Sequence, residues 1–500
     1  MDIKYLFVLS FLINHLHIIS LKNKDMKVVQ TVWTGNKSLL ENGFGWVNPQ
    51  YHLMSWALSC LSLREHYQDV ILYTDSNGYK VFSELLELPY KEVIIQYDNL
   101  RCPEPHWAYP KIVTYSLQKE PFIHVDGDVY LPKGLDRDVE RGELIAQNLE
   151  IGSSYYKNMM NDVLQRNISM PDYLREELAK DSIGSYNAGI LGGNDLDFIQ
   201  KYCQTAFEII ENNHLNDMNS QKVHINNNIF FEQILFYALS NTDNKPVTTV
   251  LDYSVRDNGY TYNDFCDFYK YSRMTLMHIL GGHKRNQRIC ELLGKTLLYK
   301  YPEYYKRILE LFPYSHKRLR DKNKCSITPN LTSQMCIAAY HDHLDSLSAK
   351  WRKISNEDLY NQEKSSSAYV GSLNAKRGIQ NLCVLSRNPY LSVFEIPKHW
   401  PLEAKRLLRD RINKDMPFDN FDIVCIPSLL DKGFKEIIIK DLCYNILNLL
   451  EEKQTFGRLF EELLPLLSFE IKKDEYQVYR LVINELEYLF YHGLICVESN

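Results

Sequence analysis

From Lys27 to Val125 the chain alternates between short apolar runs rich in β-branched residues and longer stretches with helical spacing. Four runs predict strands and two stretches predict helices: 27–33, 69–74, 92–96 and 122–125 for the strands, 49–66 and 108–118 for the helices. Strands that alternate with helices build a layered α/β sheet. Such sheets bind ligands outside the carboxyl ends of their strands. The sequence therefore predicts an α/β domain with its site where these strands end.

The fourth predicted strand runs directly into the tripeptide Asp126-Gly127-Asp128. Side chains two residues apart in an extended strand point the same way, so both carboxylates can reach one cation. Carboxylate oxygens suit Mg²⁺ or Mn²⁺, and the glycine between them leaves room for a bulky ligand. The alternative is an ordinary turn, in which such tripeptides are common. The apolar strand before Asp126 and the break at Pro132-Lys133-Gly134 favour a metal site.

A second motif, His278-Ile-Leu-Gly281-Gly282-His283-Lys284, follows about one domain later. A neutral imidazole at His278 would be a third ligand and would shift the preference towards Mn²⁺. The backbone at Gly281 and Gly282 can approach phosphate oxygens and offer N–H donors. Lys284 would place a positive charge on a departing diphosphate. A histidine before a glycine pair is more often an ordinary loop residue, so this motif gains its weight from the acidic tripeptide.

Residues 26–301 resemble a GT-A-fold glycosyltransferase, with a motif layout similar to family 8, the glycogenin and galactosyltransferase-like enzymes. The acidic tripeptide matches the metal motif of that family, with glycine where the family often has alanine. The His278 motif matches its C-terminal motif at every defining position. The segment Tyr186–Gly192 resembles its Asn-Ala-Gly segment, which implies that Asn187 and Gly189 position the donor sugar. The resemblance also implies a catalytic role for Asn187.

Phe231-Glu232-Gln233-Ile234-Leu235 stands where that family has its acidic-Gln pair near the reacting carbon. The resemblance implies that Gln233 lies close to the anomeric carbon, although the usual Asp-Gln-Asp pattern is absent. It implies transfer of a sugar from a nucleotide-sugar, with UDP-sugars as first candidates, to a saccharide or peptide acceptor. It also implies that the stereochemistry is retained. The alternatives are a nucleotide-sugar hydrolase and a non-catalytic binding protein that kept the fold.

Two further polar residues are candidates for substrate binding. Asp75 follows the second predicted strand, where the resembling enzymes contact the nucleoside, but Asp75-Ser-Asn-Gly78 also reads as an Asx turn that caps a helix. Lys111, in the helix before the acidic tripeptide, is a candidate phosphate contact. The alternative for Lys111 is a solvated helix face.

The chain is expected to comprise four regions. These are an N-terminal extension at 1–25, a GT-A-like domain at 26–312, a helical and linker region at 313–387, and a winged-helix-like domain at 388–500. Residues 287–312 predict a helix, and the polar stretch 364–368 predicts a linker.

The last region carries three apolar stripes with helical spacing, at residues 442–450, 456–464 and 478–489. They end at Gly493, a suitable residue just beyond a helix, and a strand-like run at 494–497. Three helices closed by a glycine and a strand are the outline of a winged helix.

Residues 423–498 are similar to PqqD-like peptide-recognition domains, which implies binding of a leader peptide as an added strand. A dimerisation module or a DNA-binding module has the same outline. The acidic residues Glu461, Glu462 and Glu470 and the scarcity of basic residues count against DNA.

The composition of the chain limits its class of partner and its cellular compartment. A net charge of −6 argues against a general nucleic-acid-binding protein. The 11 cysteines include no Cys-x-x-Cys pair, which fits a reducing compartment such as the cytoplasm. The apolar stretch at 5–21 is interrupted by Asn14, His15 and His17, and it is short for a membrane span. We therefore expect a cytoplasmic protein whose residues 1–25 are an extension before a natural start at Met26, with a signal anchor as the alternative.

Overall fold

The computed structural model describes residues 26–312, 330–371, 383–413, 420–431, 433–467 and 474–498. The predicted extension at 1–25 lies outside these residues. The chain divides into two compact units. The first comprises Met1–Phe44, Ser55–Cys266 and Met274–His283, and the second comprises Gly45–Met54, Asp267–Arg273 and Lys284–Asn500.

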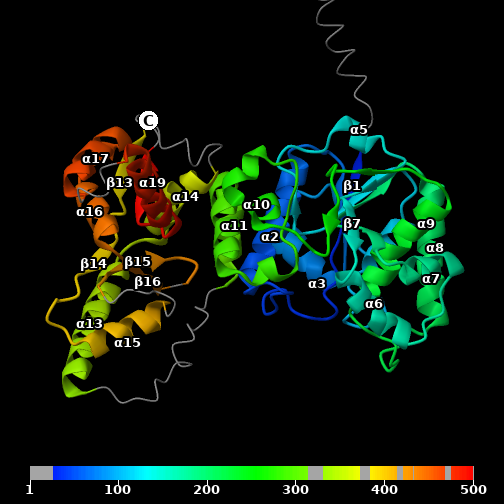
Figure 1. Ribbon diagram of the computed structural model, residues 1–500, viewed down its shortest axis with the longest axis horizontal. Helices are drawn as coiled ribbons and strands as arrows, with labels where there is room; N and C mark the ends of the chain where they lie inside the picture. The colour runs from blue at the N-terminus through cyan, green and yellow to red at the C-terminus, as the bar shows by residue number, and fades with distance from the viewer. Residues whose placement is uncertain are drawn as a thin grey trace, which may run out of the picture. The chain divides into compact units, whose positions relative to one another are not determined.

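The first unit is built on a mixed sheet to which the described part of the chain contributes seven strands, in the order β10-β6-β9-β4-β1-β2-β3. Strand β1 of this sheet is labelled in Figure 1. The strands are β1 (Lys27–Thr31), β2 (Val70–Thr74), β3 (Glu92–Ile95), β4 (Phe122–Val125), β6 (Leu144–Ala146), β9 (Ile190–Gly193) and β10 (Val247–Thr249). Strands β1 to β4 are mutually parallel, whereas β9 is antiparallel to both β4 and β6. The predicted α/β fold class is confirmed, and β1 to β4 are the four strands predicted from the sequence.

Helices cover this sheet because its strands are apolar on both faces. Every residue of β2 and β4 is buried, as is typical of a parallel sheet with helices on its faces. The two predicted helices are α2 (Pro49–Arg64) and α4 (Tyr109–Ser116). Helix α4 packs on α8 (Leu196–Asn212), which in turn packs on α9 (Leu235–Thr242). The remaining helices of this unit are short: α3 (Ser76–Tyr79), η1 (Lys80–Leu85), α5 (Arg137–Glu140), α6 (Tyr155–Gln165), α7 (Asp172–Ala179), η2 (Ile229–Ile234) and α10 (Tyr262–Phe265).

Two small sheets extend the first unit beyond the main sheet. Strand β5 (Val129–Tyr130) pairs antiparallel with β12 (Met277–His278). Strand β7 (Leu149–Gly152) lies between β11 (Val255–Arg256) and β8 (Ile183–Tyr186). Both sheets join segments that are distant in the sequence, so they depend on tertiary packing rather than on local propensity.

The second unit begins with helices whose limits differ from the prediction. The predicted helix at 287–312 is two helices, α11 (Gln287–Lys300) and α12 (Pro302–Glu310). Pro302 has no N–H to continue α11 and instead starts α12 at its first position. Next come α13 (Leu331–Trp351), α14 (Asn356–Gly371) and α15 (Leu402–Asn413). The 3-10 helix η3 (Phe268–Arg273) also belongs to this unit, whereas the 3-10 helix η4 (Gly281–Arg285) begins in the residues of the first unit.

The predicted linker at 364–368 is wrong, because these residues lie inside α14. Ser366 and Ser367 are buried, and their hydroxyls donate to the carbonyls of Gln362 and Glu363 one turn earlier. Serines satisfied in this way fit a closely packed helix. The polar serine side chains suggested an exposed linker, but in the structure they are buried in a helix.

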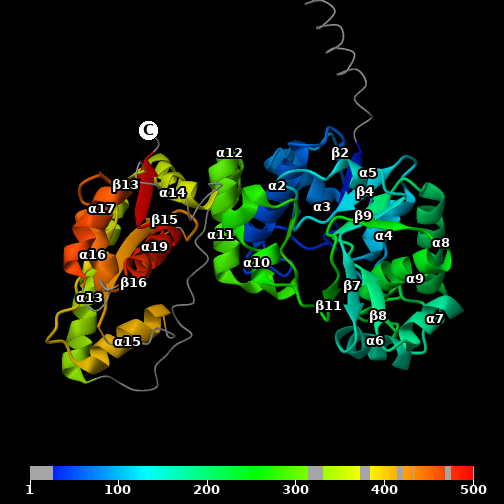
Figure 2. The same cartoon turned by 45° about the horizontal axis from the view of Figure 1, so that its top comes forward.

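The C-terminal part contains the three predicted helices, α16 (Asp441–Leu449), α17 (Phe456–Leu463) and α19 (Glu475–Tyr491), with the short η5 (Leu464–Leu466) between the last two (Figure 2). They pack with two sheets around one apolar core. In one sheet β13 (Val384–Arg387) lies between β17 (Gln454–Thr455) and the predicted β18 (Ile495–Glu498). The other sheet is β14 (Ser392–Phe394), β15 (Asp422–Ser428) and β16 (Gly433–Ile439).

Gly493 ends α19 as predicted. Its φ is +74°, a left-handed conformation that costs other residues more than glycine. The amide of Leu494 donates to the Leu489 carbonyl at 2.9 Å, which closes the helix end.

None of the helices in the described ranges has the length and apolar character that a membrane span requires.

Candidate metal centre

The acidic tripeptide lies at the carboxyl end of β4, at the edge of the sheet where the sequence placed the site. It forms a turn rather than the predicted extended strand. The amide of Val129 donates to the Asp126 carbonyl at 3.1 Å, and the chain then leaves the main sheet as β5. The turn is needed because β5 pairs with β12 and not with the strands beside β4.

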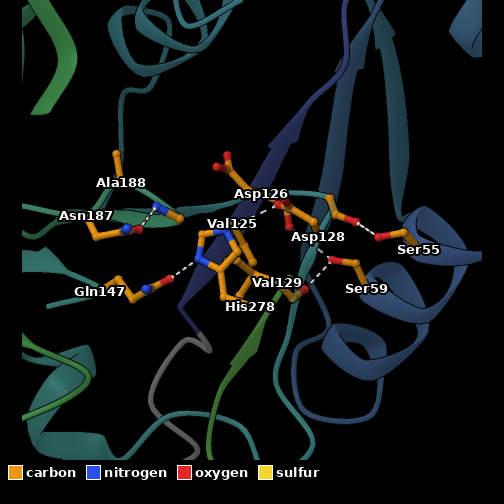
Figure 3. A network of polar contacts seen from close by, with 12 residues as sticks. Ser55, Ser59, Val125, Asp126, Asp128, Val129, Gln147, Asn187, Ala188 and His278 are labelled. Carbon is orange, nitrogen blue, oxygen red and sulfur yellow. Dashed lines mark hydrogen bonds and ion pairs between the residues drawn. The ribbon is translucent and has the colours of Figure 1, made fainter. Parts of the chain in front are cut away.

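Two serines of α2 donate hydrogen bonds to backbone carbonyls of this turn (Figure 3). Ser55 donates to the Gly127 carbonyl at 2.8 Å, and Ser59 donates to the Val129 carbonyl at 2.7 Å. A Cβ at Gly127 would lie 2.3 Å from the Trp56 ring. The glycine therefore makes room for a tryptophan of the same unit, which corrects the expectation that it makes room for a ligand.

His278 reaches the acidic tripeptide through the pairing of two strands. In that register His278 stands opposite Val129, directly after Asp128. Its Nε2 lies 3.6 Å from Asp128 Oδ1. One ligand atom from each of Asp126, Asp128 and His278 can be chosen so that all three lie within 4.8 Å of one another. The structure thus brings together the three residues predicted as metal ligands.

The other nitrogen of His278 is held by Gln147, a residue that the sequence analysis did not single out. Nδ1 of His278 and Oε1 of Gln147 are 2.7 Å apart (Figure 3). Gln147 Nε2 donates to Asn148 Oδ1 at 3.0 Å, which orients the oxygen of its amide towards the imidazole. An amide oxygen only accepts, so Nδ1 carries the proton and Nε2 keeps its lone pair for a cation. The only sign of Gln147 in the sequence is that two amide residues, Gln147 and Asn148, stand between apolar residues, and this does not reveal its partner.

Gly189 makes this arrangement possible by its lack of a side chain. A Cβ there would lie 2.4 Å from Gln147 Oε1 and 2.6 Å from His278 Cε1. The Gly189 carbonyl also accepts from the Asp126 amide at 2.9 Å. The residue predicted to position a donor sugar therefore packs directly against the predicted metal ligands.

Residues 26–311, which include all of these groups, match the model of DUF6734, a family of unknown function. The chain belongs to the DUF6734 family. No curated protein matches it. Similar solved structures include the glycosyltransferase GlyE of Streptococcus pneumoniae TIGR4, at 13% identity and a TM-score of 0.27 over 58% of this chain and 64% of that one. Another is the inositol-1-phosphate CTP transferase of T. maritima, at 10% identity and a TM-score of 0.26 over 58% and 98%.

The DUF6734 chain spans less than two thirds of the GlyE chain. TM-scores of 0.27 and 0.26 do not bear on the function of this chain. The residues of the site are the evidence for its chemistry.

Lys111 is buried beside the acidic tripeptide, so the solvated helix face considered for it is wrong. Its Nζ lies 2.9 Å from Asp126 Oδ1 and 2.8 Å from Glu232 Oε1, and it donates to the Ala188 carbonyl at 3.2 Å. Burial alone would lower the pKa of Lys111, but the two carboxylates hold it above its usual value. The lysine therefore stays charged and partly neutralises Asp126.

Glu232 is a buried carboxyl in the DUF6734 site. It accepts from Tyr115 at 3.1 Å as well as from Lys111, while its second oxygen has no hydrogen-bond partner among the described groups. Burial raises its pKa to about 7, against the lowering effect of Lys111.

The neighbouring Gln233 is also buried but forms no hydrogen bond within the described chain, so its amide is available to a ligand.

Asn187 is fully engaged by its surroundings. Its Nδ2 donates to Glu150 Oε1 at 3.0 Å and to the Tyr260 hydroxyl at 3.1 Å, and its Oδ1 accepts from the Gly189 amide at 2.9 Å. These contacts fix the turn between β8 and β9. Glu150, which the sequence analysis missed, also accepts from Tyr156 and Tyr260.

Asp75 is engaged in the way that the Asx-turn alternative predicts. Its Oδ1 accepts from the Gly78 amide at 2.9 Å and so caps α3. Its Oδ2 accepts from the amide and the hydroxyl of Thr34, each at 2.7 Å. Three donors already use this carboxylate.

The glycines of the second motif are exposed. Gly281 has a φ of +44°, and a Cβ at Gly281 or Gly282 would meet nothing within 4 Å. This backbone therefore leaves open space for a ligand. Lys284, three residues further along, belongs to the second compact unit.

The donor set fits a hard or borderline divalent cation. Two carboxylates and one imidazole supply oxygen and nitrogen ligands, and no cysteine is among them. This combination suits Mn²⁺ and accepts Mg²⁺. The hydrogen bond from His278 to Gln147 is the outer support that metal-binding histidines usually have.

Proposed function

We propose that this DUF6734 protein is a metal-dependent glycosyltransferase that transfers a sugar from a nucleotide-sugar to a saccharide or peptide acceptor. The observation that carries the proposal is the convergence of Asp126, Asp128 and His278 at the carboxyl edge of an α/β sheet, with His278 oriented by Gln147. Ligands of such sheets bind at this edge. The match of both motifs to family 8 enzymes supports the same reading.

A divalent cation held by the three ligands would neutralise charge on the departing diphosphate. The backbone amides of the exposed Gly281 and Gly282 would offer donors to phosphate oxygens, and Lys284 would add a positive charge to the leaving group. UDP is the first nucleotide to test. Asp75 would position the backbone near the nucleoside rather than contact the nucleoside itself. Its oxygens already accept hydrogen bonds from Thr34 and Gly78.

The donor sugar would lie against the turn that Asn187 and Gly189 shape. Gln233 is the residue we assign next to the anomeric carbon, because its amide is not used by the described protein groups. Lys111 would tune the charge on Asp126 rather than contact phosphate, since it already has two carboxylate partners. For the C-terminal module we retain the proposal of a winged-helix-like domain that recognises a leader peptide on an acceptor.

The experiment is a calorimetric titration of nucleotide-sugars with and without Mn²⁺, for the wild type, Asp128→Ala and Asp138→Ala. Asp138 is an exposed aspartate on α5, outside the site, and serves as the matched control. We expect one donor to bind only with Mn²⁺, and to bind the control but not Asp128→Ala. Failure of every donor to bind a folded wild-type protein would refute the proposal. Rapid release of free sugar without an acceptor would instead identify a hydrolase.

A further inference from the structure

A polar cavity lies within the second unit, where α11, α14, β15 and the corner at 492–493 meet. It holds about 660 Å³ of empty space, part of which is open to solvent. Helices α11 and α14 lie side by side in both views (Figures 1 and 2). The wall mixes aromatic rings, hydroxyls and charged groups, including Tyr51, Tyr305 and Ser366. None of the groups assigned to the glycosyltransferase chemistry lines it.

Lys295 of α11 is one of the residues that line this wall. It forms no hydrogen bond and no ion pair with any of the described residues. Burial and the positive charge of Lys435 lower its pKa to about 8, while the charges of Glu363 and Glu291 act in the opposite direction. A half-buried ammonium that has lost water and has gained neither a hydrogen bond nor a close ion pair is unfavourable. An anion in the cavity would remove this cost.

The other charged groups of the wall are already satisfied. Glu363 accepts from the Leu429 amide at 2.9 Å and from the Tyr305 hydroxyl at 3.3 Å. Glu291 accepts from Gln287 at 2.9 Å. Lys435 lies 3.9 Å from Asp431. Among these four charged groups, Lys295 is therefore the one without a hydrogen bond or close ion pair, and an anionic group of a ligand could bind to it.

The same wall limits the charge of that ligand. Glu291 and Glu363 line the same wall and already attract Lys295, so a dianion such as phosphate would be repelled more than a ligand with a single carboxylate. Burial would raise the pKa of Glu291, but Lys435 and hydrogen bonds hold it at about 2, so this carboxylate is charged at neutral pH.

Hydroxyl oxygens of the wall can accept hydrogen bonds from a ligand. Ser366 donates its proton to the Gln362 carbonyl at 3.2 Å, and Tyr305 donates its proton to Glu363. Each hydroxyl oxygen keeps lone pairs that face no donor in these contacts. A ligand with its own hydroxyl or amino donors would complement them.

We propose that this cavity binds a small organic molecule with one carboxylate, which lies on Lys295, and with hydroxyl or amino groups against Ser366 and Tyr305. Polar pockets with a few convergent groups are the usual form of small-molecule sites. The proposal is independent of the glycosyltransferase reading, because it rests on other residues.

The test uses the full chain and calorimetry with five probes: gluconate, serine, acetate, inorganic phosphate and the uncharged sorbitol. Variants are Lys295→Met and, as the matched control, Lys350→Met, which removes an exposed lysine of α13 in the same unit. Thermal unfolding checks the fold. We expect Lys295→Met to be at least as stable as the wild type, because an unpaired charge is replaced by an apolar chain of similar length.

We expect gluconate or serine to bind at one site, more tightly than acetate, phosphate or sorbitol. Which of the two binds tells a hydroxy acid from an amino acid. The affinity should fall at least tenfold in Lys295→Met and stay unchanged in Lys350→Met. Absence of binding by gluconate and serine, equal binding to Lys295→Met, or tighter binding of phosphate or sorbitol would each overturn the proposal.

Discussion

His278 and Gln147 form a hydrogen-bonded pair, with 2.7 Å between Nδ1 and Oε1. The pair joins the end of β12 to the residue that follows β6, segments that lie 131 residues apart in the sequence. It fixes which nitrogen of the imidazole faces Asp128. The arrangement has a direct consequence for cation binding.

Replacing Gln147 with leucine should weaken Mn²⁺ binding by about 10- to 100-fold, the usual effect of removing an outer partner of a metal-binding histidine. Without the acceptor, the imidazole can rotate or place its proton on Nε2. Calorimetric titration of Mn²⁺ measures the change. Gln204→Leu, which removes an exposed glutamine on α8, is the control. Unchanged Mn²⁺ affinity in folded Gln147→Leu would show that this pair does not orient the ligand.

Gly189→Ala should disturb the same pair from its other side. The new methyl group would lie within 2.6 Å of both Gln147 and His278, so one of them must move. We expect weaker Mn²⁺ binding and a loss of about 1–3 kcal/mol in the free energy of unfolding, as for other overpacked sites. Urea unfolding with and without Mn²⁺ measures both effects.

The control for Gly189→Ala is Gly282→Ala, because a Cβ at Gly282 meets nothing within 4 Å. Its free energy of unfolding should equal that of the wild type. If Gly189→Ala were as stable as this control and bound Mn²⁺ equally well, the close packing at the site would be disproved.

Much of the first unit could be predicted because its signals are local. The apolar runs that became β1 to β4 are continuous in the sequence, and each strand lies within the predicted limits. Asp126, Asp128 and His278 were recognised by residue type and spacing. Their meeting depends on the β5 and β12 pair, which is only two residues long on each side and leaves almost no periodic signal.

The parts that escaped prediction depend on tertiary contacts. Gln147 follows the short strand β6 and Glu150 lies in the short strand β7, and the importance of both polar residues appears only when His278 and Asn187 are placed beside them. Ser366 looked like part of a linker because serines are common there, yet it packs within α14. The roles proposed for Gln233 and Lys284 remain predictions.

Lys111 should be essential to the stability of the first unit. It is the cation that Asp126 and Glu232 share in a buried setting. Lys111→Met would leave two carboxyl groups there without a counter-charge, and breaking a buried pair costs about 3–5 kcal/mol. Urea unfolding should show this loss, whereas Lys119→Met, at an exposed position just beyond α4, should show little. A small loss for both variants would mean that Glu232 and Asp126 accommodate the change by taking up a proton.

Asp257 should make the stability of the first unit depend on pH. Its carboxylate caps α6, accepting from the amides of Ser153, Ser154 and Tyr155 at 2.8–3.1 Å and from the Ser153 hydroxyl at 2.6 Å. These hydrogen bonds, with that from the Ser153 hydroxyl the strongest, lower its pKa to about 2 from the usual 3.8. Because the folded pKa is depressed, the stabilisation is complete above the usual value and is lost as the pH falls through about 2.

Asp257→Ala should therefore destabilise the protein at neutral pH, and the difference from the wild type should shrink as the pH falls from about 4 towards about 2. Asp252→Ala, at an exposed aspartate of the same segment, is the control. Thermal unfolding of the three proteins across this range is the measurement. A difference between wild type and Asp257→Ala that stays constant with pH would show that the charge of this carboxylate does not stabilise α6, and that the helix is held by packing alone.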